Sequence, residues 1–513
     1  MSRTRRATIG ALFGYSRFAL AIVVGLSLVP FTLRHIGAEF YGYWLASGEL
    51  LAYAAMTEFG VLVTLPWLVA EADGQGNRHR MRELVTTGGA AALLSAGAAL
   101  LVSLALWFVL PSVLHLPPEK QAAVLGPLVV MGIIGVVAFP LRVFSCVLTG
   151  LQDVRFIGIV DLAVNVLNPA LTVILLLRGD GLYALALGTA VPQRLAGFVN
   201  VARLRFLAPD LLRLWHRPRW PAIRILFAEG TGAWVGGRGW RLISASDGLV
   251  LATLGRPTAI AALAVTNKLA QALTQLSWVP CDSGLAGLAH LAGEQRGPRL
   301  RESIVVMVRV YLALAGSVAC VILAANPAFV RGWVGLNFYA GANANFLIAV
   351  LVVTMTFGHA LAVIPSVLGQ RIQIGVATLL AGLLHVGLAF GLGLRLGIVG
   401  VLMAGVLSHG LVFSALAWRP FARATGMPET ALFSEVLRPW ALRLAPLVVL
   451  AFVLQEVAGT PPLPVTIAMG GLVGLFGVWY MRPLYLAFGP VRALYDRLFW
   501  WLPLGPASGT AKP

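Results

Sequence analysis

The most regular feature of the chain is a series of long apolar runs, each interrupted by proline, glycine or charged residues. Most runs are about 20 residues or longer, which is the length that an α-helix needs to cross the hydrocarbon core of a bilayer. The pattern predicts fourteen membrane-spanning helices, and an even number places both termini on one side of the membrane. The predicted helices are about 9–31, 41–70, 84–110, 122–149, 156–177, 181–202, 226–254, 258–291, 303–325, 344–368, 372–394, 397–418, 440–457 and 463–481.

The composition excludes a water-soluble protein. Of the 513 residues, 59% are hydrophobic and 11% are charged, and the mean hydropathy is +0.86. Soluble domains carry about 25% charged residues, so a soluble fold would lack the polar surface to cover this much apolar area. The predicted fold class is therefore an all-α polytopic membrane protein. The three cysteines lie in apolar runs without disulfide or zinc spacing, and the sequence predicts no metal site and no cofactor.

Positive charge gathers in the short segments between the runs. The net charge is +18, and with a cytoplasmic N-terminus the inner segments hold 25 of the 38 lysines and arginines, against six in the outer segments. By the positive-inside rule, this ratio predicts that both termini are cytoplasmic and that the first run is a retained helix of an inner-membrane protein. The lipid bilayer accounts for the basic charge, so we expect no nucleic-acid partner.

Two parts of the chain resemble one another. Segment 74–85 matches segment 293–304 in a glycine, two arginines and a glutamate, and shorter matches relate 157–178 to 374–395 at nearly the same offset. Parallel repeats of six helices are a transporter architecture, with the substrate site at the repeat interface. The predicted parts are an N-lobe over 1–205 (helices 1–6), a basic cytoplasmic linker over 206–225, a C-lobe over 226–420 (helices 7–12), and an appended helix pair with a cytoplasmic tail over 421–513.

Four cations lie well inside predicted spans: Arg17, Arg238, Arg241 and Lys268. An ionisable group at the centre of a span costs ~2.5–3.5 kcal/mol, so such groups usually face a cavity or a partner. The planar guanidinium fork binds phosphate oxygens in a bidentate manner. These residues therefore predict a cationic central cavity that holds a diphosphate head group.

A structural role for the same cations is the alternative. Arg238 or Arg241 could pair with Asp247 or Glu229. Arg17 could extend toward the inner surface and keep its charge in water.

Other polar residues inside the spans complete the candidate site. The acids Glu49, Glu58 and Asp247 are candidates for lining the cavity or for coupling transport to an H⁺ or Na⁺ gradient. Asn165 and Asn168 precede a proline and could contact sugar hydroxyls or tie helices together.

Three histidines, His359, His385 and His409, lie in the middle of predicted helices 10, 11 and 12. Interhelical hydrogen bonding explains them better than a proton relay does. The sequence holds no P-loop and no catalytic constellation, so it predicts a transporter rather than an enzyme.

Short motifs spread over helices 1–12 resemble those of a known family. Segment 30–44 ends an apolar helix and continues with Arg, Gly, an acid and Tyr-Gly; it is followed by the motifs at 58–60, 150–152 and 247–255. Their order and spacing resemble the Wzx-type polysaccharide-biosynthesis flippases of the multidrug/oligosaccharidyl-lipid/polysaccharide exporter (MOP) superfamily. Segment 256–262 departs from the pattern, because it lacks the tyrosine that many relatives have at the start of helix 8.

The resemblance implies two six-helix lobes in a V shape that move an undecaprenyl-diphosphate-linked oligosaccharide to the outer leaflet by alternating access. Such a flippase serves the synthesis of O-antigen, capsule or exopolysaccharide, and its energy source is often an ion gradient. By position, Arg17, Arg238, Arg241 and Lys268 would line its cavity. The expected partners are the lipid-linked substrate, the bilayer and the polysaccharide polymerase machinery, and we expect a monomer.

Three other functions stay open. A lipid II flippase belongs to the same superfamily, and the motif in 30–44 weighs against it. A cation-coupled multidrug exporter would need an acidic, aromatic cavity, whereas the first helix carries Arg17 and no acid. A membrane glycan polymerase or ligase is an enzyme of another class, and the outer loops of at most about 20 residues leave little room for its acceptor domain.

Overall fold

The structure is a computed structural model that describes residues 3–54, 61–212, 231, 234–282, 284–285, 288, 291–292 and 297–486. Throughout these residues the regular elements are helical and none is a strand. Ten of the described helices are long and apolar enough to cross a membrane. The predicted fold class, an all-α multi-pass membrane protein, is confirmed.

Each predicted span overlaps a described helical segment. The α-helices are α1 (Arg3–Ala54), α2 (Val61–Gly74), α3 (Arg78–Val113), α4 (Pro118–Gly150), α5 (Val154–Leu177), α6 (Leu182–Leu207), α8 (Asp247–Thr253), α9 (Pro257–Asp282), α11 (Gly297–Trp333), α12 (Ala342–Val367), α13 (Arg371–Leu396), α14 (Ile398–Gly405), α15 (Ser414–Thr425), α16 (Glu429–Ala431), α17 (Arg438–Ala458) and α18 (Leu463–Tyr480). Short elements are η2 (Pro209–Leu212), η3 (Leu336–Phe338) and η6 (Arg482–Leu484), which are 3₁₀ helices, and η4 (Val406–Phe413) and η5 (Leu432–Leu437), which are π-helical.

The chain forms two compact units. Unit 1 consists of residues 1–264 and 375–404, and unit 2 consists of residues 265–374 and 405–513. The predicted lobe boundaries at 205 and 226 come from an internal sequence repeat. A division of the chain into compact units does not test that repeat, so the boundaries stay a prediction.

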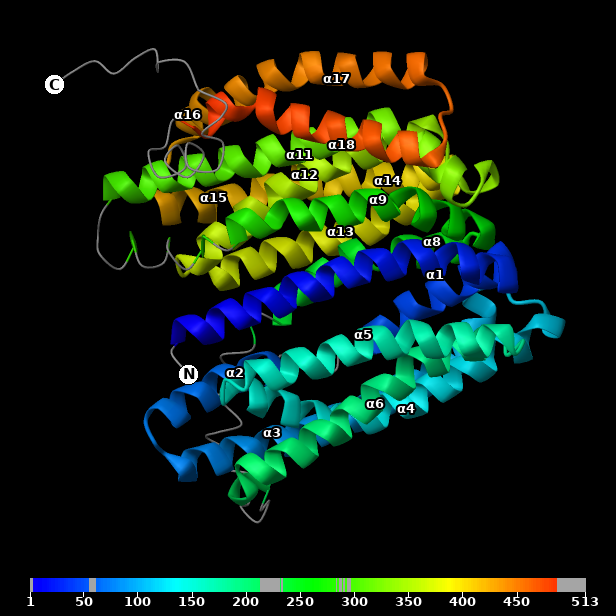
Figure 1. Ribbon diagram of the computed structural model, residues 1–513, viewed down its shortest axis with the longest axis vertical. Coiled ribbons are helices and arrows are strands. Elements are labelled where there is room, and N and C mark those ends of the chain that lie inside the picture. The colour runs from blue at the N-terminus through cyan, green and yellow to red at the C-terminus, as the bar shows by residue number, and fades with distance from the viewer. Residues whose placement is uncertain are drawn as a thin grey trace. The chain divides into compact units, whose positions relative to one another are not determined.

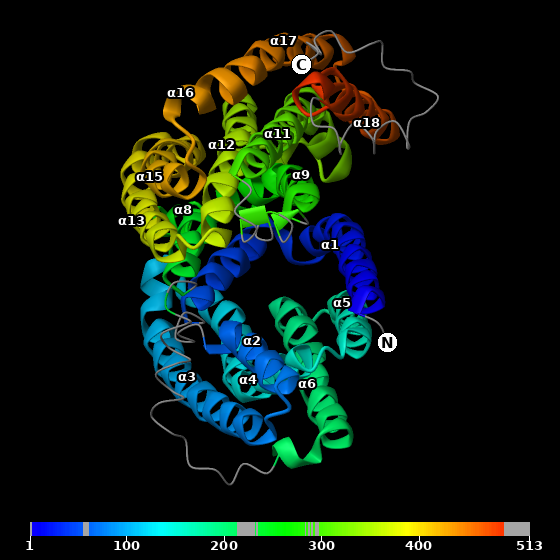
Figure 2. The ribbon, with the colours of Figure 1, turned by 90° about the vertical axis from the view of Figure 1, so that its left-hand side faces the viewer.

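Unit 1 is built around the packing of α1 to α6 (Figures 1 and 2). α1 lies beside α5, and α4 packs against α3 and α6. Its apolar core joins four helices through the fully buried side chains of Leu65, Met81, Val147 and Leu204. α1 contains a break at Gly37, which has φ 79° and ψ 164°. Only glycine adopts this backbone conformation readily, and the break separates the first two predicted spans.

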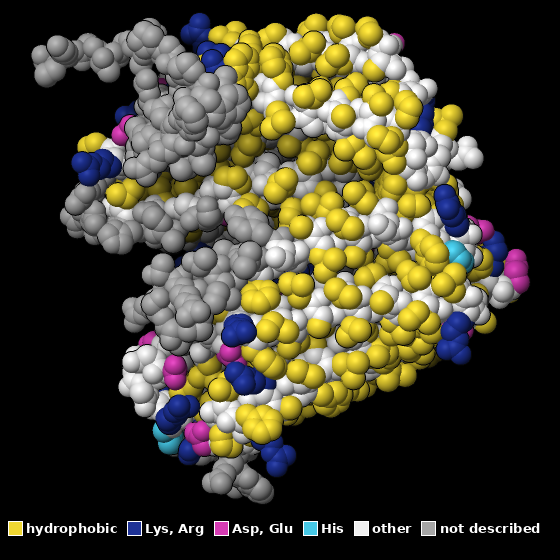
Figure 3. Space-filling view, viewed as in Figure 1, with side chains coloured by type: hydrophobic (Ala, Val, Ile, Leu, Met, Phe, Trp, Pro, Cys, Tyr) yellow, Lys and Arg dark blue, Asp and Glu magenta, His cyan; other side chains and the backbone are white. Residues whose placement is uncertain are grey.

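Ion pairs at the helix ends of unit 1 agree with the predicted alternation of the spans. The Lys120 Nζ atom lies 2.7 Å from Glu39 Oε1, and both residues belong to segments predicted outside. The Arg203 Nε atom lies 2.8 Å from Asp153 Oδ2, and both belong to segments predicted inside. In Figure 3, most visible charged side chains lie toward the helix ends, and hydrophobic side chains cover the helix flanks. The absolute orientation stays a prediction.

The predicted span 226–254 is interrupted in unit 1. Residues 234–244 are helical, Ala245 and Ser246 form a bend, and α8 begins at Asp247. Ser246 Oγ donates to the carbonyl of Leu242 at 2.5 Å, which is the local serine bond that competes with regular helical bonding. The expectation of one continuous helix is therefore corrected to two helical segments joined by a bend.

Unit 2 is organised around α11. Of the ten candidate spans α11 is the most buried, and it packs against α12, α17 and α18. α18 can approach α11 closely because residue 477 is a glycine. A Cβ atom added there would lie 2.8 Å from Ser317 Oγ of α11. Small residues at helix crossings are a common way to pack membrane helices. The appended pair α17 and α18 is thus part of the packed core of unit 2.

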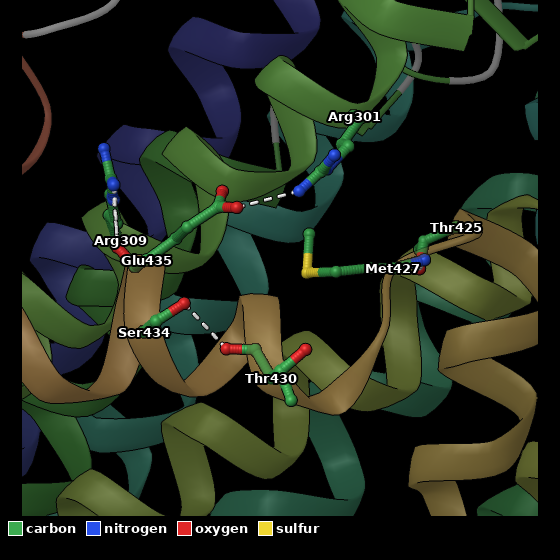
Figure 4. A network of polar contacts seen from close by, with 7 residues as sticks. All are labelled: Arg301, Arg309, Thr425, Met427, Thr430, Ser434 and Glu435. Atoms are coloured by element: carbon green, nitrogen blue, oxygen red, sulfur yellow. Dashed lines mark hydrogen bonds and ion pairs between the residues drawn. The ribbon is translucent and has the colours of Figure 1, made fainter.

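A polar network fastens the connector between α15 and α17 to α11 (Figure 4). The guanidinium of Arg309 donates through Nε and Nη2 to the carbonyl of Glu435, at 2.9 and 2.7 Å. Its Nη1 atom reaches the carbonyl of Leu484 at 3.4 Å, just after α18. The carboxylate of Glu435 accepts from Arg301 at 2.8 Å. The wide turn of η5 exposes the carbonyl that Arg309 satisfies.

Candidate functional site

The first of the predicted cavity cations, Arg17, forms an ion pair inside the membrane spans. Its Nη1 atom lies 2.6 Å from Asp161 Oδ2, and the two side chains are 53% and 42% exposed. Arg17 belongs to α1 and Asp161 to α5, two helices apolar enough to span a bilayer. An ion pair this exposed would be costly against acyl chains, so we expect it to face a polar space. The pair therefore has the accessibility that a cavity residue needs.

Asp161 begins a polar stripe along α5. Asn165 and Asn168 follow it at i+4 and i+7, and residues at these spacings share one face of a helix. The Asn165 Nδ2 atom donates to the Asp161 carbonyl at 2.8 Å, so its side chain is held against its own helix. The stripe ends at Thr172, which is buried where α5 meets Gly188 of α6. The stripe thus lies on an inner face of unit 1.

Arg238 and Arg241 lie in the helical segment that precedes the bend. The Arg238 guanidinium carbon lies 5.0 Å from the centre of the Trp234 ring, a cation–π contact that holds its side chain along the segment. The side chain of Arg241 is exposed. The segment packs directly on α13, because a Cβ atom at Gly239 would lie 2.2 Å from the Thr378 backbone. Gly239 therefore allows the segment that carries both arginines to lie directly against α13.

Lys268, the fourth predicted cation, is half-buried on the part of α9 that belongs to unit 2. Arg17, Arg238 and Arg241 belong to unit 1. Convergence of all four on a single cavity stays a prediction.

Glu49 belongs to α1, and its side chain contacts the N-terminal end of α8. Its Oε2 atom accepts from the backbone N–H of Leu249 at 2.7 Å, and the neighbouring Gly248 leaves room for the carboxylate. The first amides of a helix lack intrahelical partners and carry partial positive charge, so a carboxylate is stabilised there. Glu49 on α1 therefore anchors the second half of the interrupted helix.

Asp247, the first residue of α8, is paired with a histidine. His385 Nε2 on α13 lies 2.9 Å from Asp247 Oδ1, and the ring also donates to the backbone carbonyl of Ala404 on α14. The His385 side chain is 1% exposed. His385 is a partner of Asp247 that the sequence did not predict. Two other acids considered from the sequence, Glu58 and Glu229, lie outside the described residues.

Unit 2 holds a second contact between a histidine and a carboxylate. Asp282 Oδ1 accepts from Tyr311 Oη at 2.5 Å and lies 2.9 Å from His359 Nε2. The Trp278 ring is stacked on the His359 ring, with centres 4.0 Å apart. These contacts join α9, α11 and α12. Both His385 and His359 thus hydrogen-bond between helices, as the sequence favoured.

Sequence reasoning missed two contacts of the site, that of Arg17 with Asp161 and that of Asp247 with His385. The sequence did not connect Asp161 with Arg17, although they lie ~8 Å and ~12 Å from the inner ends of their predicted helices, within one helical turn of the same depth. Matching depths along the chain would have suggested the pair. No comparable signal in the sequence pairs His385 with Asp247, because their contact depends on the bend before α8.

No protein-family model matches the sequence, and no curated protein matches it by sequence. Solved structures share its fold. A multidrug resistance MATE family transporter of the MOP superfamily, in an inward-facing conformation, has a TM-score of 0.61 and 14% identity over 83% of this chain and 99% of the other. The lipid II flippase MurJ, in an inward closed conformation, has a TM-score of 0.63 and 13% identity over 94% of this chain and 99% of the other. A eukaryotic MATE transporter has a TM-score of 0.60 and 12% identity over 82% and 99%. At these identities the likeness establishes a shared fold.

Proposed function

We propose that the protein is a MOP-superfamily flippase that moves an undecaprenyl-diphosphate-linked oligosaccharide across the bacterial inner membrane by alternating access. The observation that carries the proposal is the exposed Arg17–Asp161 ion pair on two membrane helices. It supplies an accessible guanidinium at a depth where an anionic head group must pass. The fold shared with transporters and with a lipid flippase supports the same class of function.

The chemistry of a diphosphate suits this arrangement. Arginine offers planar, charge-assisted hydrogen bonds to phosphate oxygens and remains charged at all relevant pH values. A diphosphate competes with Asp161 for Arg17, so that Arg17 keeps an anionic partner, and the released carboxylate of Asp161, which is 42% exposed, is left to water in the cavity. Arg238, Arg241 and Lys268 add positive charge, and Asn165 and Asn168 offer amides to sugar hydroxyls on the same substrate.

The appended helix pair favours a lipid flippase over a drug exporter. The structural match with the lipid II flippase covers 94% of this chain, and the match with the MATE transporter covers 83%. The difference is about 11% of the chain. That share is close to the part of the chain occupied by 429–484, which holds α17 and α18. A cationic set of site residues also disfavours cationic drugs as substrates. A lipid II flippase is the second candidate, since the same coverage supports it. A membrane glycan polymerase or ligase is a weaker candidate, because the shared fold belongs to transporters.

The proposal includes a setting for the protein. We place it in the inner membrane with both termini cytoplasmic, as a monomer that hands its substrate to polysaccharide polymerase machinery. Single cysteines at Arg78 and Arg178 test the orientation, since a membrane-impermeant maleimide should label only Arg178→Cys in intact spheroplasts. Labelling of Arg78→Cys alone would reverse the orientation.

Flipping is tested in liposomes that contain the full-length protein and a fluorescent undecaprenyl-diphosphate-linked oligosaccharide. Wild-type protein should expose lipid of the inner leaflet to an impermeant quencher, and Arg17→Ala should slow this step by about tenfold or more. Arg178→Ala is the matched control, because Arg178 lies in a loop predicted outside. Lipid II and ethidium are run in parallel. Movement of lipid II alone selects the second candidate, and movement of ethidium alone selects drug export.

A further inference from the structure

We propose that Asp247 and His385 form a proton-binding joint at the bend of the interrupted helix, and that its proton decides whether α8 stays tied to α13. The proton binding is argued from the 2.9 Å contact between His385 and Asp247, together with the hydrogen bond of the ring to Ala404. Its link to transport rests on the proposed function, and names H⁺ as the ion that the site uses.

The hydrogen-bonding pattern of His385 requires an added proton. The ring donates to the carbonyl of Ala404, so one of its nitrogens carries a hydrogen. A neutral imidazole has one N–H, and its other nitrogen is then a bare acceptor. Yet Nε2 lies 2.9 Å from an oxygen of Asp247, which is also an acceptor when ionised. One further proton must lie between them, whether it is assigned to the imidazole or to the carboxyl group.

Loss of that proton would break the contact. The lone pair of His385 Nε2 and the carboxylate of Asp247 would then face each other at hydrogen-bond distance, inside a unit where His385 is 1% exposed. Two facing acceptors repel, and the buried ring of His385 has little water of its own to take the place of the lost bond. The two groups must therefore move apart when the proton leaves, so the proton and the position of α8 are coupled.

The joint lies directly at the bend that interrupts the helix in the described part of this span. Asp247 is the first residue of α8, directly after the non-helical residues Ala245 and Ser246. Glu49 of α1 holds the same end of α8 through Leu249 N–H at 2.7 Å. α8 therefore has one polar contact that does not need a proton, to Glu49 of α1, and one that does, to His385 of α13. Deprotonation removes the polar tie to α13 and leaves the apolar packing of Val250 beside Gly393.

Among the described residues, four helices supply polar groups at the joint. α1 contributes Glu49, α8 contributes Asp247, α13 contributes His385, and α14 contributes the Ala404 carbonyl. Arg241 lies just before the bend in the preceding helical segment, and its side chain is exposed. Two carboxylates and a neutral imidazole carry a charge of −2, and one bound proton lowers it to −1, which favours binding of a cation as small as H⁺.

The joint is next to the proposed substrate cations in the chain. Arg238 and Arg241 lie in the helical segment that ends at the bend. A change in the attachment of α8 changes the bend, and with it the direction of the segment that carries both guanidinium groups. Ala245 and Ser246 thus connect the proton-binding contact of α8 to the segment whose arginines would bind the head group.

The histidine of unit 2 serves as a matched control. His359 also contacts a carboxylate at 2.9 Å, but Asp282 already accepts from the Tyr311 hydroxyl at 2.5 Å. A neutral His359 can donate through Nε2 without a further proton, so its contact does not depend on protonation. His359→Gln keeps a donor at this position.

The proton is tested first without substrate, by ¹⁵N NMR of the full-length protein labelled at its eight histidines. His385→Gln identifies the His385 signals. Between about pH 4 and about pH 10, the wild-type His385 signals should show one titration step. Asp247→Asn should abolish this step, because the asparagine amide donates to Nε2 and no added proton is needed. An unchanged step in Asp247→Asn, or no step in the wild type, overturns the joint.

The link to transport is tested in liposomes with the fluorescent lipid-linked oligosaccharide. An imposed pH gradient should change the wild-type flipping rate by about fivefold or more, whereas an equal Na⁺ gradient should not. Asp247→Asn should lose this response, and His359→Gln should keep it. Flipping that responds only to Na⁺ overturns the role of the joint and leaves the proposed function intact. A titrating His385 in a protein that moves no lipid overturns the proposed function and leaves the joint intact.

Discussion

Arg17 and Asp161 lie 144 positions apart in the sequence and meet in an ion pair of 2.6 Å between α1 and α5. Substitutions of these two residues can show whether Arg17 has a structural or a substrate-binding role. A structural pair needs both partners, whereas a substrate site needs the cation and releases the anion when substrate binds.

Substitutions of the two partners should therefore act in opposite directions. Arg17→Ala should weaken binding of undecaprenyl diphosphate by about tenfold or more, because it removes charge-assisted hydrogen bonds. Asp161→Asn should bind the same lipid at least as tightly as the wild type, because the competing carboxylate is gone. Binding is measured by tryptophan quenching in micelles, with Arg178→Ala as the control. Equal losses in both variants would assign the pair to structure alone.

The helices could be predicted because hydropathy reports membrane spans directly. Each predicted span overlaps a helical segment of the structure, and the break at Gly37 lies between two of them. The bend at Ala245 and Ser246 escaped prediction, because the apolar run continues through it and a serine in a membrane helix is common. Hydropathy measures what the environment requires and does not report where a helix bends.

The site could be predicted only in part, for a related reason. Arg17 stands out as a charge within an apolar run, whatever its neighbours are. Its partner Asp161 and the partner His385 of Asp247 depend on which helices are adjacent. Adjacency is set by packing among many similar apolar faces, and one sequence carries little information about it.

The anchor between Glu49 and α8 predicts a stability effect at Gly248. A Cβ atom there would lie 2.7 Å from Glu49 Oε1 and displace the carboxylate from the Leu249 amide. Gly248→Ala should lower stability by about 1–2 kcal/mol, which a thermal unfolding curve in detergent reports as a lower Tm. Gly237→Ala is the control, because a Cβ atom at Gly237 meets nothing within 4 Å. In a Glu49→Ala background Gly248→Ala should cost little, and full additivity would contradict the anchor.

The connector network predicts that Arg309 matters more than Arg301. Arg309 supplies three hydrogen bonds to the carbonyls of Glu435 and Leu484, whereas Arg301 makes one ion pair in which both side chains are 40% exposed or more. Arg309→Met should lower stability by about 2–4 kcal/mol and speed proteolysis of the connector, because two buried carbonyls lose their donors. Arg301→Met should cost less than about 1 kcal/mol. Similar proteolysis rates in both variants would refute this ranking.

Arg238 and Arg241 should differ in what they contribute. Arg238 lies along its helix against the Trp234 ring, so Arg238→Ala should reduce both stability and flipping. Arg241 is exposed, so Arg241→Ala should reduce flipping and leave the Tm unchanged. A charge-retaining Arg241→Lys should recover part of the rate, because lysine attracts a phosphate without binding it in a bidentate manner. The measurements are Tm in detergent and initial flipping rates in liposomes at matched protein content. A double variant Arg238→Ala with Arg241→Ala that still flips lipid at the wild-type rate would remove both arginines from the site.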